Sequence, residues 1–295
     1  MRWLVTGAAG MLGSDLVEVL SEAGEYRVTA TTRATLDVTD AAAVHEAVPG
    51  HDVVVNAAAW TDVDGAESHE EVATAVNGHA LAPLAQACAA TGARLVQVST
   101  DYVLPGDATG PYPEDAPTAP LNAYGRGKLI GEQAVLGRLP DTGYVVRTAW
   151  LYGAQGRNFV STMLRLAGER ETVDVVDDQR GQPTWSYALA GQLVALGRAA
   201  HQGRAPAGIY HGTAAGDTTW FGLARAVFAA AGLDPQRVRP TTSDRFPRPA
   251  RRPAYSVLAH GRWAAAGIPP LPDWHAMLAS ALPHLPPAAL LEKRA

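Results

Sequence analysis

The feature that most constrains the fold of this 295-residue chain is a turn with three glycines close to its amino end. Gly7, Gly10 and Gly13 follow the apolar run 2–6, and the segment 11–23 then carries apolar residues at helical spacing. A strand, a tight glycine turn and a helix in this order predict the first unit of a doubly wound α/β fold. In that unit the turn and the amino end of the helix bind the diphosphate of a dinucleotide. Three glycines alone are common in turns, so they indicate dinucleotide binding only because they come directly after a strand.

The first half of the chain continues with alternating strand and helix patterns. Strands are predicted at 26–31, 52–55, 94–98 and 144–147, and helices at 40–48, within 66–90 and at 123–136. This alternation indicates parallel strands joined by crossover helices. The predicted fold class is therefore α/β, with a Rossmann-type doubly wound parallel sheet.

After Thr148 the pattern is less regular. Helices are predicted at 158–167, 186–200 and 219–231, and strands at 172–176 and 208–211. Prolines cluster in 235–253 and 269–272, which indicates extended loops there. We therefore expect residues 1–150 to form the dinucleotide-binding Rossmann domain. Residues 151–295 are expected to form mainly a smaller α/β lobe for the substrate, interleaved with late strands of the first domain.

Composition and charge exclude several other classes of protein. The formal net charge is -5 and the basic residues gather only at Arg248, Arg251 and Arg252, so a nucleic-acid partner is not expected. The single cysteine, Cys88, rules out an internal disulfide, and no Cys/His spacing resembles a metal site. No apolar run has the length of a membrane span, and no signal-peptide pattern is found in residues 1–20. We expect a cytoplasmic protein that neither enters a membrane nor binds a metal.

The end of the second predicted strand indicates which dinucleotide binds. A carboxylate there would bind the ribose 2′-hydroxyl of NADH and repel the 2′-phosphate of NADPH. The strand ends instead with Thr31, Thr32 and Arg33, and the first acid is Asp37. NADPH is therefore favoured, with NADH possible if Arg33 is only a solvated loop charge. The other residues expected around the cofactor are Met11, Leu12, Asp37, Val38, Ala57, Ala58 and Ala59.

Tyr124 and Lys128 stand four residues apart in the predicted helix 123–136, so they share one face. An ammonium beside a phenol favours tyrosinate, and we expect it to lower the pKa of Tyr124 and improve the phenol as a proton donor. Thr100 follows the strand 94–98, at the sheet edge where doubly wound folds bind ligands. These three are the candidate catalytic residues for the reduction of a carbonyl. The alternative is a core tyrosine and a solvated lysine that share this spacing by chance.

The helix that carries the pair is a poor helix by itself. Gly125, Gly127 and Gly131 each cost up to about 1 kcal/mol relative to alanine. We expect tertiary packing or a ligand to hold this helix.

In an ordered set of motifs the chain resembles the dTDP-4-dehydrorhamnose reductase family, within the extended short-chain dehydrogenase/reductases. The matches are Asn56-Ala57-Ala58-Ala59, Ser99-Thr100-Asp101-Tyr102-Val103, Tyr124-Gly125-x-x-Lys128 and Arg147-Thr148-x-Trp150-x-Tyr152, with others in 61–67, 158–167, 178–184 and 252–253. Each motif is common by itself. Their order over roughly residues 2 to 260 is specific.

The resemblance implies hydride transfer from NADPH to the C4 ketone of dTDP-4-dehydro-6-deoxy-L-mannose, which yields dTDP-L-rhamnose. Tyr124 would protonate the new alkoxide, and Lys128 would hold the nicotinamide ribose, so both residues would also contact the cofactor. The residues that the resemblance assigns to the dTDP-sugar substrate are Thr100, Asp101, Trp150, Asn158 and Arg252.

The chain departs from the family pattern at three points. Leu104-Pro105-Gly106 replaces a usual phenylalanine and an acidic or small residue, in a loop expected to border the substrate. Gly127 stands where relatives usually carry serine or threonine. The acidic residues that join some members into a magnesium-linked dimer are not evident, so we expect no metal and either a monomer or a homodimer.

Three related functions are alternatives to the reduction of dTDP-4-dehydrorhamnose. A dihydrostreptose synthase reduces the same nucleotide sugar with ring contraction and looks very similar, so only the product separates the two. A regulatory subunit of a related branch binds NADP without turnover and can retain the same residues. A sugar-nucleotide 4,6-dehydratase is disfavoured, because its chemistry needs Asp-Glu after the threonine and this chain has Asp101-Tyr102.

Overall fold

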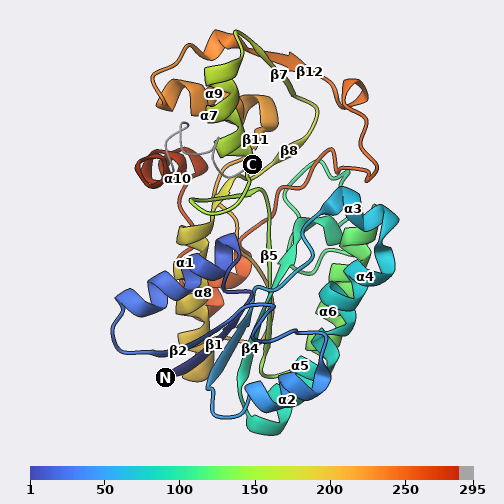
Figure 1. The fold of residues 1–295 in the computed structure, drawn as a ribbon, viewed down its shortest axis with the longest axis vertical. Coiled ribbons are helices and arrows are strands. Elements are labelled where there is room, and N and C mark those ends of the chain that lie inside the picture. The colour runs from blue at the N-terminus through green and yellow to red at the C-terminus, as the bar shows by residue number, and fades with distance from the viewer. Residues whose placement is uncertain (286–295) are drawn as a thin grey trace.

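The computed structural model describes residues 1–285, and its centre is a six-stranded sheet in which every neighbouring pair is parallel (Figure 1). The strands, in order across the sheet, are β10 (Gly208–His211), β5 (Gly143–Thr148), β4 (Arg94–Thr100), β3 (Val53–Asn56), β1 (Arg2–Thr6) and β2 (Arg27–Thr31). Each of them coincides with a strand predicted from the sequence. The predicted α/β class with a Rossmann-type parallel sheet is confirmed.

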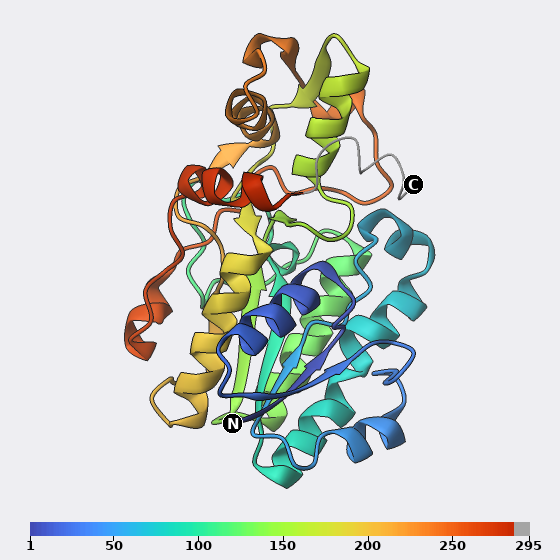
Figure 2. The same ribbon diagram turned by 60° about the vertical axis from the view of Figure 1, so that its left-hand side comes forward.

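Helices cover both faces of this sheet (Figures 1 and 2). One face carries α1 (Met11–Glu22) and α8 (Ser186–His201), and the other carries α2 (Ala41–Ala47), α5 (Leu81–Thr91) and α6 (Ala123–Arg138). Successive side chains of β1 point to opposite faces, so Trp3 and Val5 belong to one hydrophobic core and Leu4 belongs to the other. Both faces of the sheet are therefore buried, as a parallel sheet requires.

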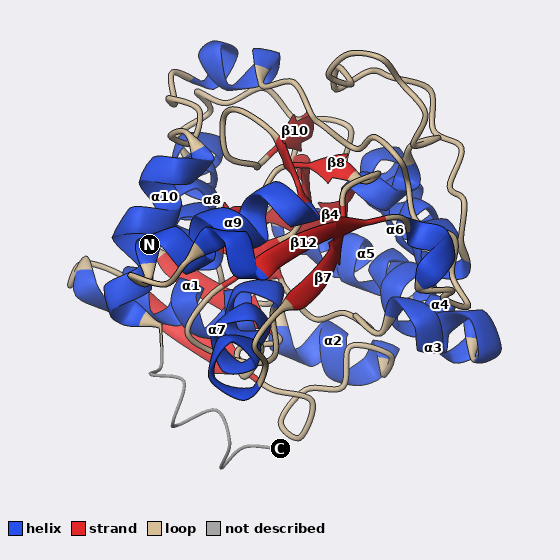
Figure 3. Ribbon diagram, turned by 90° about the horizontal axis from the view of Figure 1, so that it is seen from above, coloured by secondary structure: helices blue, strands red, loops and turns tan. Residues whose placement is uncertain are grey.

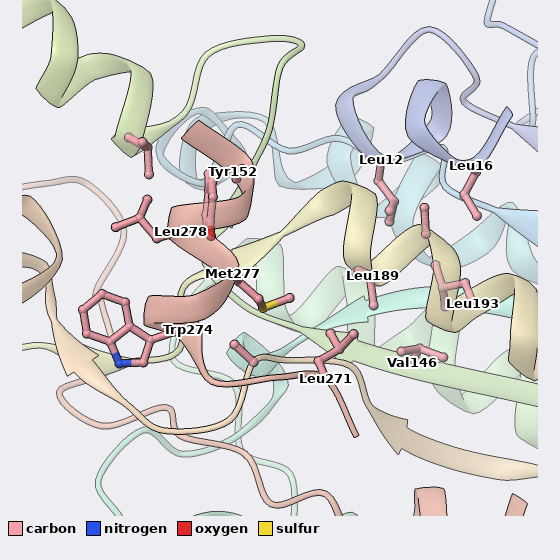
Figure 4. Packing of buried hydrophobic residues seen from close by; sticks show 14 of the residues in the cluster. Leu12, Leu16, Val146, Tyr152, Leu189, Leu193, Leu271, Trp274, Met277 and Leu278 are labelled. Carbon is pink, nitrogen blue, oxygen red and sulfur yellow. The ribbon is translucent and has the colours of Figure 1, made fainter. Parts of the chain in front are cut away.

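The core beneath α1 and α8 continues into the second half of the chain (Figure 4). There α10 (Trp274–Ala281) adds its apolar side chains to the same cluster that fills the space between α1, α8 and the sheet. The residues labelled in the view are Leu12, Leu16, Val146, Tyr152, Leu189, Leu193, Leu271, Trp274, Met277 and Leu278. One continuous core thus connects the sheet to the smaller lobe.

The smaller lobe lies above the carboxyl ends of the sheet strands (Figures 1 and 3). It contains α7 (Phe159–Glu169), α9 (Trp220–Ala230) and the parallel pair β7 (Val173–Val176) and β12 (Val238–Thr241). Two further pairs are short: β6 (Leu151–Tyr152) with β9 (Thr184–Trp185), and β8 (Arg180–Gly181) with β11 (Thr218–Thr219). The division at 1–150 and 151–295 stays a prediction, and residues 286–295 of the second part lie outside the described residues.

β12 lies where the sequence predicted an extended loop, and α10, which was not predicted, begins just after the predicted loop 269–272. β12 lies inside the proline-rich segment 235–253, and Pro240 is tolerated because a two-stranded sheet leaves edge positions whose amide needs no partner. α10 begins two residues after Pro272, and the Asp273 carboxylate accepts a hydrogen bond from the backbone amide of His275. The loop prediction was wrong at β12, because a proline is also tolerated at a sheet edge. The prolines at 269–272 do lie in a loop, and the helix that follows them was missed.

The single long helix expected within 66–90 is divided. α3 (Val63–Ser68) is followed by α4 (Glu70–Thr74), a π-helix (Ala75–His79) and then α5. His69 leaves the helical region with φ -133° and ψ 40°, which separates α3 from α4. Helical spacing alone does not reveal such a break, because the segments on both sides of His69 are helical.

The glycines of α6 are explained by this divided segment and by the loop after β4. A Cβ on Gly125 would lie 2.2 Å from the carbonyl oxygen of Tyr102, and a Cβ on Gly131 would lie 2.4 Å from the carbonyl oxygen of Asn77 in the π-helix. Both distances are too short for any side chain. Close backbone packing, rather than helix propensity, holds α6 in place.

Replacing Gly131 by alanine is expected to destabilise the protein by about 1–3 kcal/mol, because the added methyl group overlaps the Asn77 carbonyl. Gly137 on the same helix is the matched control, since an added Cβ there has no atom within 4 Å. Gly137→Ala should raise the free energy of unfolding by about 0.5–1 kcal/mol. Urea denaturation measures both variants, and effects of equal sign would contradict the close approach at Gly131.

Candidate active site

A cavity of about 1060 Å³ runs along the carboxyl edge of the sheet, beneath the smaller lobe. Because β1, β3, β4 and β5 are neighbours in this order, the glycine turn after β1 lies toward one side and Trp150 after β5 toward the other. The predicted site residues that line the cavity are Gly7, Gly10, Met11, Leu12, Gly13, Arg33, Asp37, Val38, Ala57, Ala58, Ala59, Thr100, Asp101, Tyr124, Lys128 and Trp150. Residues far apart in the sequence therefore meet at one site.

The glycine turn is shaped for close approach of a ligand. Gly7 has φ +70°, and a Cβ there would lie 2.6 Å from the backbone nitrogen of Ala58. A Cβ on Gly13 would lie 2.1 Å from the carbonyl oxygen of Gly7. Gly10 is the N-cap residue of α1 and no side chain caps the helix, so the first amides of α1 lie at the cavity without a side-chain partner. An uncapped helix start beside a glycine turn fits the diphosphate of a dinucleotide.

The next part of the cavity follows the end of β2. Thr32, Arg33, Asp37, Val38 and Thr39 line it. The Asp37 carboxylate accepts hydrogen bonds from the hydroxyl (2.7 Å) and the backbone amide (2.9 Å) of Thr39, and these bonds lower the pKa of Asp37. Asp37 is thus held by Thr39, and Arg33 is the cationic side chain that lines this part of the cavity.

Thr100, Tyr124 and Lys128 meet beside the end of β4. Thr100 closes the strand and donates a hydrogen bond to the Asp101 carboxylate at 2.9 Å. Tyr124 lies in the first turn of α6, which Asn122 caps by accepting from the amide of Gly125 at 2.8 Å. The buried Lys128 Nζ donates to the carbonyl oxygen of Val98 at 2.6 Å. The strand end and the helix start thus place three polar groups on one wall of the cavity.

The prediction that the pKa of Tyr124 is lowered was wrong. Burial, together with the nearby Asp101 carboxylate, raises the pKa of Tyr124 to about 12, although the Thr100 hydroxyl opposes the shift. Burial also lowers the pKa of Lys128 to about 8, against the opposing charge of Glu132. Spacing along a helix indicated that the two side chains share a face, but it did not reveal that burial and the Asp101 carboxylate would raise the pKa of Tyr124.

A buried ion pair lies behind Lys128, and sequence reasoning did not single it out. Arg147 Nη2 lies 2.7 Å from Glu132 Oε2, and both side chains are 2% exposed. The Ser99 hydroxyl donates to Glu132 Oε1 at 2.5 Å. Glu132 follows Lys128 by one helical turn, and that spacing is the signal that could have found it. The network connects α6 to β4 and β5 directly beneath the candidate catalytic residues.

Asp101 is buried and faces the Thr100 and Ser256 hydroxyls. Burial raises the pKa of Asp101 to about 6, and the Ser256 and Thr100 hydroxyls together with nearby backbone amides only partly oppose this. The same carboxylate raises the pKa values of Tyr102 and Tyr124. Asp101 is therefore electrostatically linked to the candidate proton donor.

Asp101→Asn is expected to remove a pH dependence of stability. Because burial raises the pKa of Asp101 to about 6, the folded protein holds the proton more tightly than the unfolded chain between about pH 4 and pH 6. The free energy of unfolding, relative to the variant, should therefore fall by roughly 2–3 kcal/mol as the pH rises through this window. Urea denaturation at several pH values measures the difference. A difference that is independent of pH would contradict the raised pKa.

Two predicted substrate residues lie outside the lining of the cavity. Asn158 caps α7 by accepting from the amide of Ser161 at 2.9 Å, and it donates to the Gly153 carbonyl at 2.9 Å. Arg252 forms an ion pair with Asp64 at 2.9 Å. Their roles in substrate binding stay predictions.

The loop 104–106 does not line the cavity either, contrary to expectation. Leu104 is buried in a small cluster with Val103, Tyr112 and Leu258. Gly106 has φ +81°, and a Cβ there would lie 2.5 Å from Pro253 Cβ. Leu104 and Gly106 therefore serve packing.

Trp220 is a cavity residue that sequence reasoning missed. Its ring lies over the ring of Trp150, with the centroids 3.5 Å apart and the planes 7° apart. Trp150 has φ +49°. No local sequence signal indicates that a residue of α9 would reach the loop after β5.

The described part of the chain contains neither a candidate metal site nor a membrane-spanning helix. Within residues 1–285, no three or more His, Cys, Asp or Glu side chains are grouped so that they could hold a metal ion. None of the described helices is both long and apolar enough to cross a membrane.

The doubly wound sheet, the uncapped helix start at the glycine turn and the Tyr-x-x-x-Lys wall together define a Rossmann-type oxidoreductase of the short-chain dehydrogenase/reductase class. More particularly, residues 1–286 match the family described as RmlD substrate binding domain, and the chain belongs to the dTDP-4-dehydrorhamnose reductase family.

Relatives with high identity support this assignment over nearly the whole chain. A dTDP-4-dehydrorhamnose reductase of Streptomyces griseus is 58% identical over 286 residues, which cover 96% of this chain and 94% of that protein. A dTDP-4-keto-6-deoxy-D-glucose reductase of Streptomyces niveus is 52% identical, with 96% and 97% covered. The crystal structure of a dTDP-4-dehydrorhamnose reductase from Bacillus anthracis in complex with NADP is 36% identical, with a TM-score of 0.88 and 95% and 98% covered.

Proposed function

We propose that this chain uses NADPH to reduce the C4 ketone of dTDP-4-dehydro-6-deoxy-L-mannose, giving dTDP-L-rhamnose. The observation that carries the proposal is the meeting of Thr100, Tyr124 and Lys128 on one cavity, between the glycine turn and the two stacked tryptophans. The name of the Streptomyces griseus relative supports the choice of sugar.

In the proposed reaction the bound NADPH supplies the hydride that goes to the ketone carbon. Tyr124 gives its phenolic proton to the ketone oxygen, which becomes the new hydroxyl group. A pKa of about 12 keeps this phenol protonated at neutral pH, so the proton is present when the reaction begins. Thr100 turns its hydroxyl from Asp101 to the same oxygen and fixes the ketone in place.

Lys128 has two proposed roles beside Tyr124. Its ammonium lies close to the end of β4, bonded to the Val98 carbonyl, where it can bind the hydroxyls of the nicotinamide ribose. Its charge also favours the tyrosinate that remains after proton transfer. Asp101 and Trp150 are proposed to contact the sugar. Asn158 and Arg252 would join them only by exchanging their present bonds for bonds to the sugar nucleotide.

The proposed preference for NADPH depends on Arg33. In our proposal its guanidinium binds the adenosine 2′-phosphate, and the absence of a carboxylate at the end of β2 removes a repulsive charge. Arg33→Ala should therefore raise the KM for NADPH by about tenfold and leave the KM for NADH unchanged, since NADH has no 2′-phosphate. Initial rates with the two cofactors test this. Equal losses with both would contradict the assignment.

A different 4-keto sugar is the second candidate substrate, because the Streptomyces niveus relative is named for the D-glucose configuration. NADPH oxidation should be measured with purified dTDP-4-keto-6-deoxy sugars of both configurations, and the products should be identified by NMR. dTDP-L-rhamnose is the expected product. A ring-contracted sugar would indicate dihydrostreptose synthesis, and binding of NADPH without turnover of any sugar would indicate a regulatory subunit.

We further propose that the protein works in the cytoplasm as a monomer or homodimer. Light scattering on the purified protein distinguishes these two states.

A further inference from the structure

We propose that Trp220 is a positioning residue for the substrate, whose indole holds Trp150 in the conformation that shapes the sugar end of the cavity. The inference rests on the proposed function, because it assigns Trp150 to the sugar. It adds a residue from α9, in a part of the chain to which no role in the reaction has so far been given.

The backbone of Trp150 is the first reason to look for such a residue. Among residues 1–285 it is the one non-glycine residue with positive φ, at +49°. A bulky L-residue rarely adopts this region, and it does so only where the surrounding structure holds it there. The conformation turns the chain directly after Thr148 and Ala149, which also line the cavity.

The contacts of the Trp150 ring show what holds it. The Trp220 ring stacks on it at 3.5 Å with the planes nearly parallel. The backbone of β8 also packs against the indole, because a Cβ on Gly181 would lie 2.5 Å from Trp150 Cε2. Any side chain at Gly181 would displace the ring. Trp150 is thus fixed by an aromatic stack and by a glycine that leaves room for it.

Trp220 is itself fixed from two other elements. Its Nε1 donates to the side-chain oxygen of Gln179 at 3.2 Å, and the Phe159 ring of α7 lies 4.5 Å away. Thr219 caps the helix start directly before it, by accepting from the amide of Gly222 at 3.1 Å. Trp220 of the smaller lobe is therefore a rigid support for Trp150, which follows β5 at the carboxyl edge of the main sheet.

The position of the stack connects this support to the chemistry. Both tryptophans line the cavity that also contains Thr100 and Tyr124. If Trp220 were truncated, Trp150 would lose its stacking partner and could leave its strained conformation, and the wall around the sugar would widen. The cofactor end, on the far side of Tyr124, would keep its structure.

A double-mutant cycle tests whether Trp220 acts through Trp150. Trp220→Ala should raise the KM for the sugar about three- to tenfold, the factor that corresponds to the loss of one aromatic stack, and leave the Kd for NADPH unchanged. Trp220→Phe, which keeps a ring over Trp150, should restore most of the affinity. In the Trp150→Ala background, Trp220→Ala should have no further effect on this KM. Phe221→Ala is the control for the loss of an aromatic ring from the same helix.

The stack is also measured without turnover. The same cycle, read as the equilibrium constant of unfolding in urea, should show a coupling factor of about three to ten between the two tryptophans. If this coupling is found but the wild type reduces no sugar, the proposed function is wrong, while the stabilising contact between Trp150 and Trp220 is still confirmed. If the sugar is reduced but the two effects on KM multiply, Trp220 contacts the sugar independently and the positioning role is overturned.

Discussion

Replacing Tyr124 by phenylalanine is expected to lower kcat by about 10²–10⁴-fold, while the Kd for NADPH stays nearly the same. The phenol is the one group that the proposal uses as a proton donor, and phenylalanine keeps the ring that packs edge-on against Tyr102 at 5.9 Å. Steady-state rates with the 4-keto sugar measure the first quantity, and fluorescence titration measures the second.

The control for this prediction removes a phenolic hydroxyl outside the cavity. Tyr187 lies on α8, and its hydroxyl donates to Glu22 at 2.6 Å. Tyr187→Phe should leave kcat unchanged. If Tyr124→Phe behaves like this control, Tyr124 is not the acid, and Asp101, with a pKa of about 6 beside Thr100, becomes the group to test.

Replacing Glu132 by leucine is expected to lower the free energy of unfolding by about 3–5 kcal/mol, because the change leaves the buried Arg147 guanidinium without its partner. The Ser99 hydroxyl would lose its acceptor as well. Since the charge of Glu132 raises the pKa of Lys128, the variant should also lower that pKa further. Urea denaturation measures the stability, and the pH profile of kcat reports on Lys128.

The same helix provides a matched ion pair at the surface. Arg126 on α6 lies 2.7 Å from Glu70, and both side chains are more than 40% exposed. Glu70→Leu should cost less than about 1 kcal/mol, because water screens exposed pairs and solvates the remaining charge. A similar cost for the two variants would show that the buried charge of Arg147 is not what stabilises this region.

Much of the fold was predictable because its signals are local. The turn at Gly7, Gly10 and Gly13 depends on conformations that glycine allows within a few residues, and the strands are short apolar runs with turn residues around them. The α/β alternation then leaves few ways to arrange parallel strands. The cofactor end and the Tyr124–Lys128 wall follow from this topology, since strand ends and helix starts meet at one sheet edge.

The predictions that failed concern contacts between elements. The break at His69 and the strand β12 have weak or misleading local patterns, and packing decides them; the helix α10 was not predicted at all. The pKa of Tyr124 is high because of burial and the Asp101 carboxylate, and burial is not a property of residue spacing. The loop 104–106 lies away from the cavity because Leu104 has a hydrophobic cluster to fill.

The sequence by itself determined the class of fold, the dinucleotide-type turn and the three candidate catalytic residues, because each depends on residues that are neighbours in the chain or one helical turn apart. Only the tertiary structure decided what stands around them. It pairs Glu132 with Arg147 behind Lys128, binds Arg252 to Asp64, and stacks Trp220 of α9 on Trp150 after β5. These contacts join residues separated by 15, 188 and 70 positions, and their formation depends on how the layers pack.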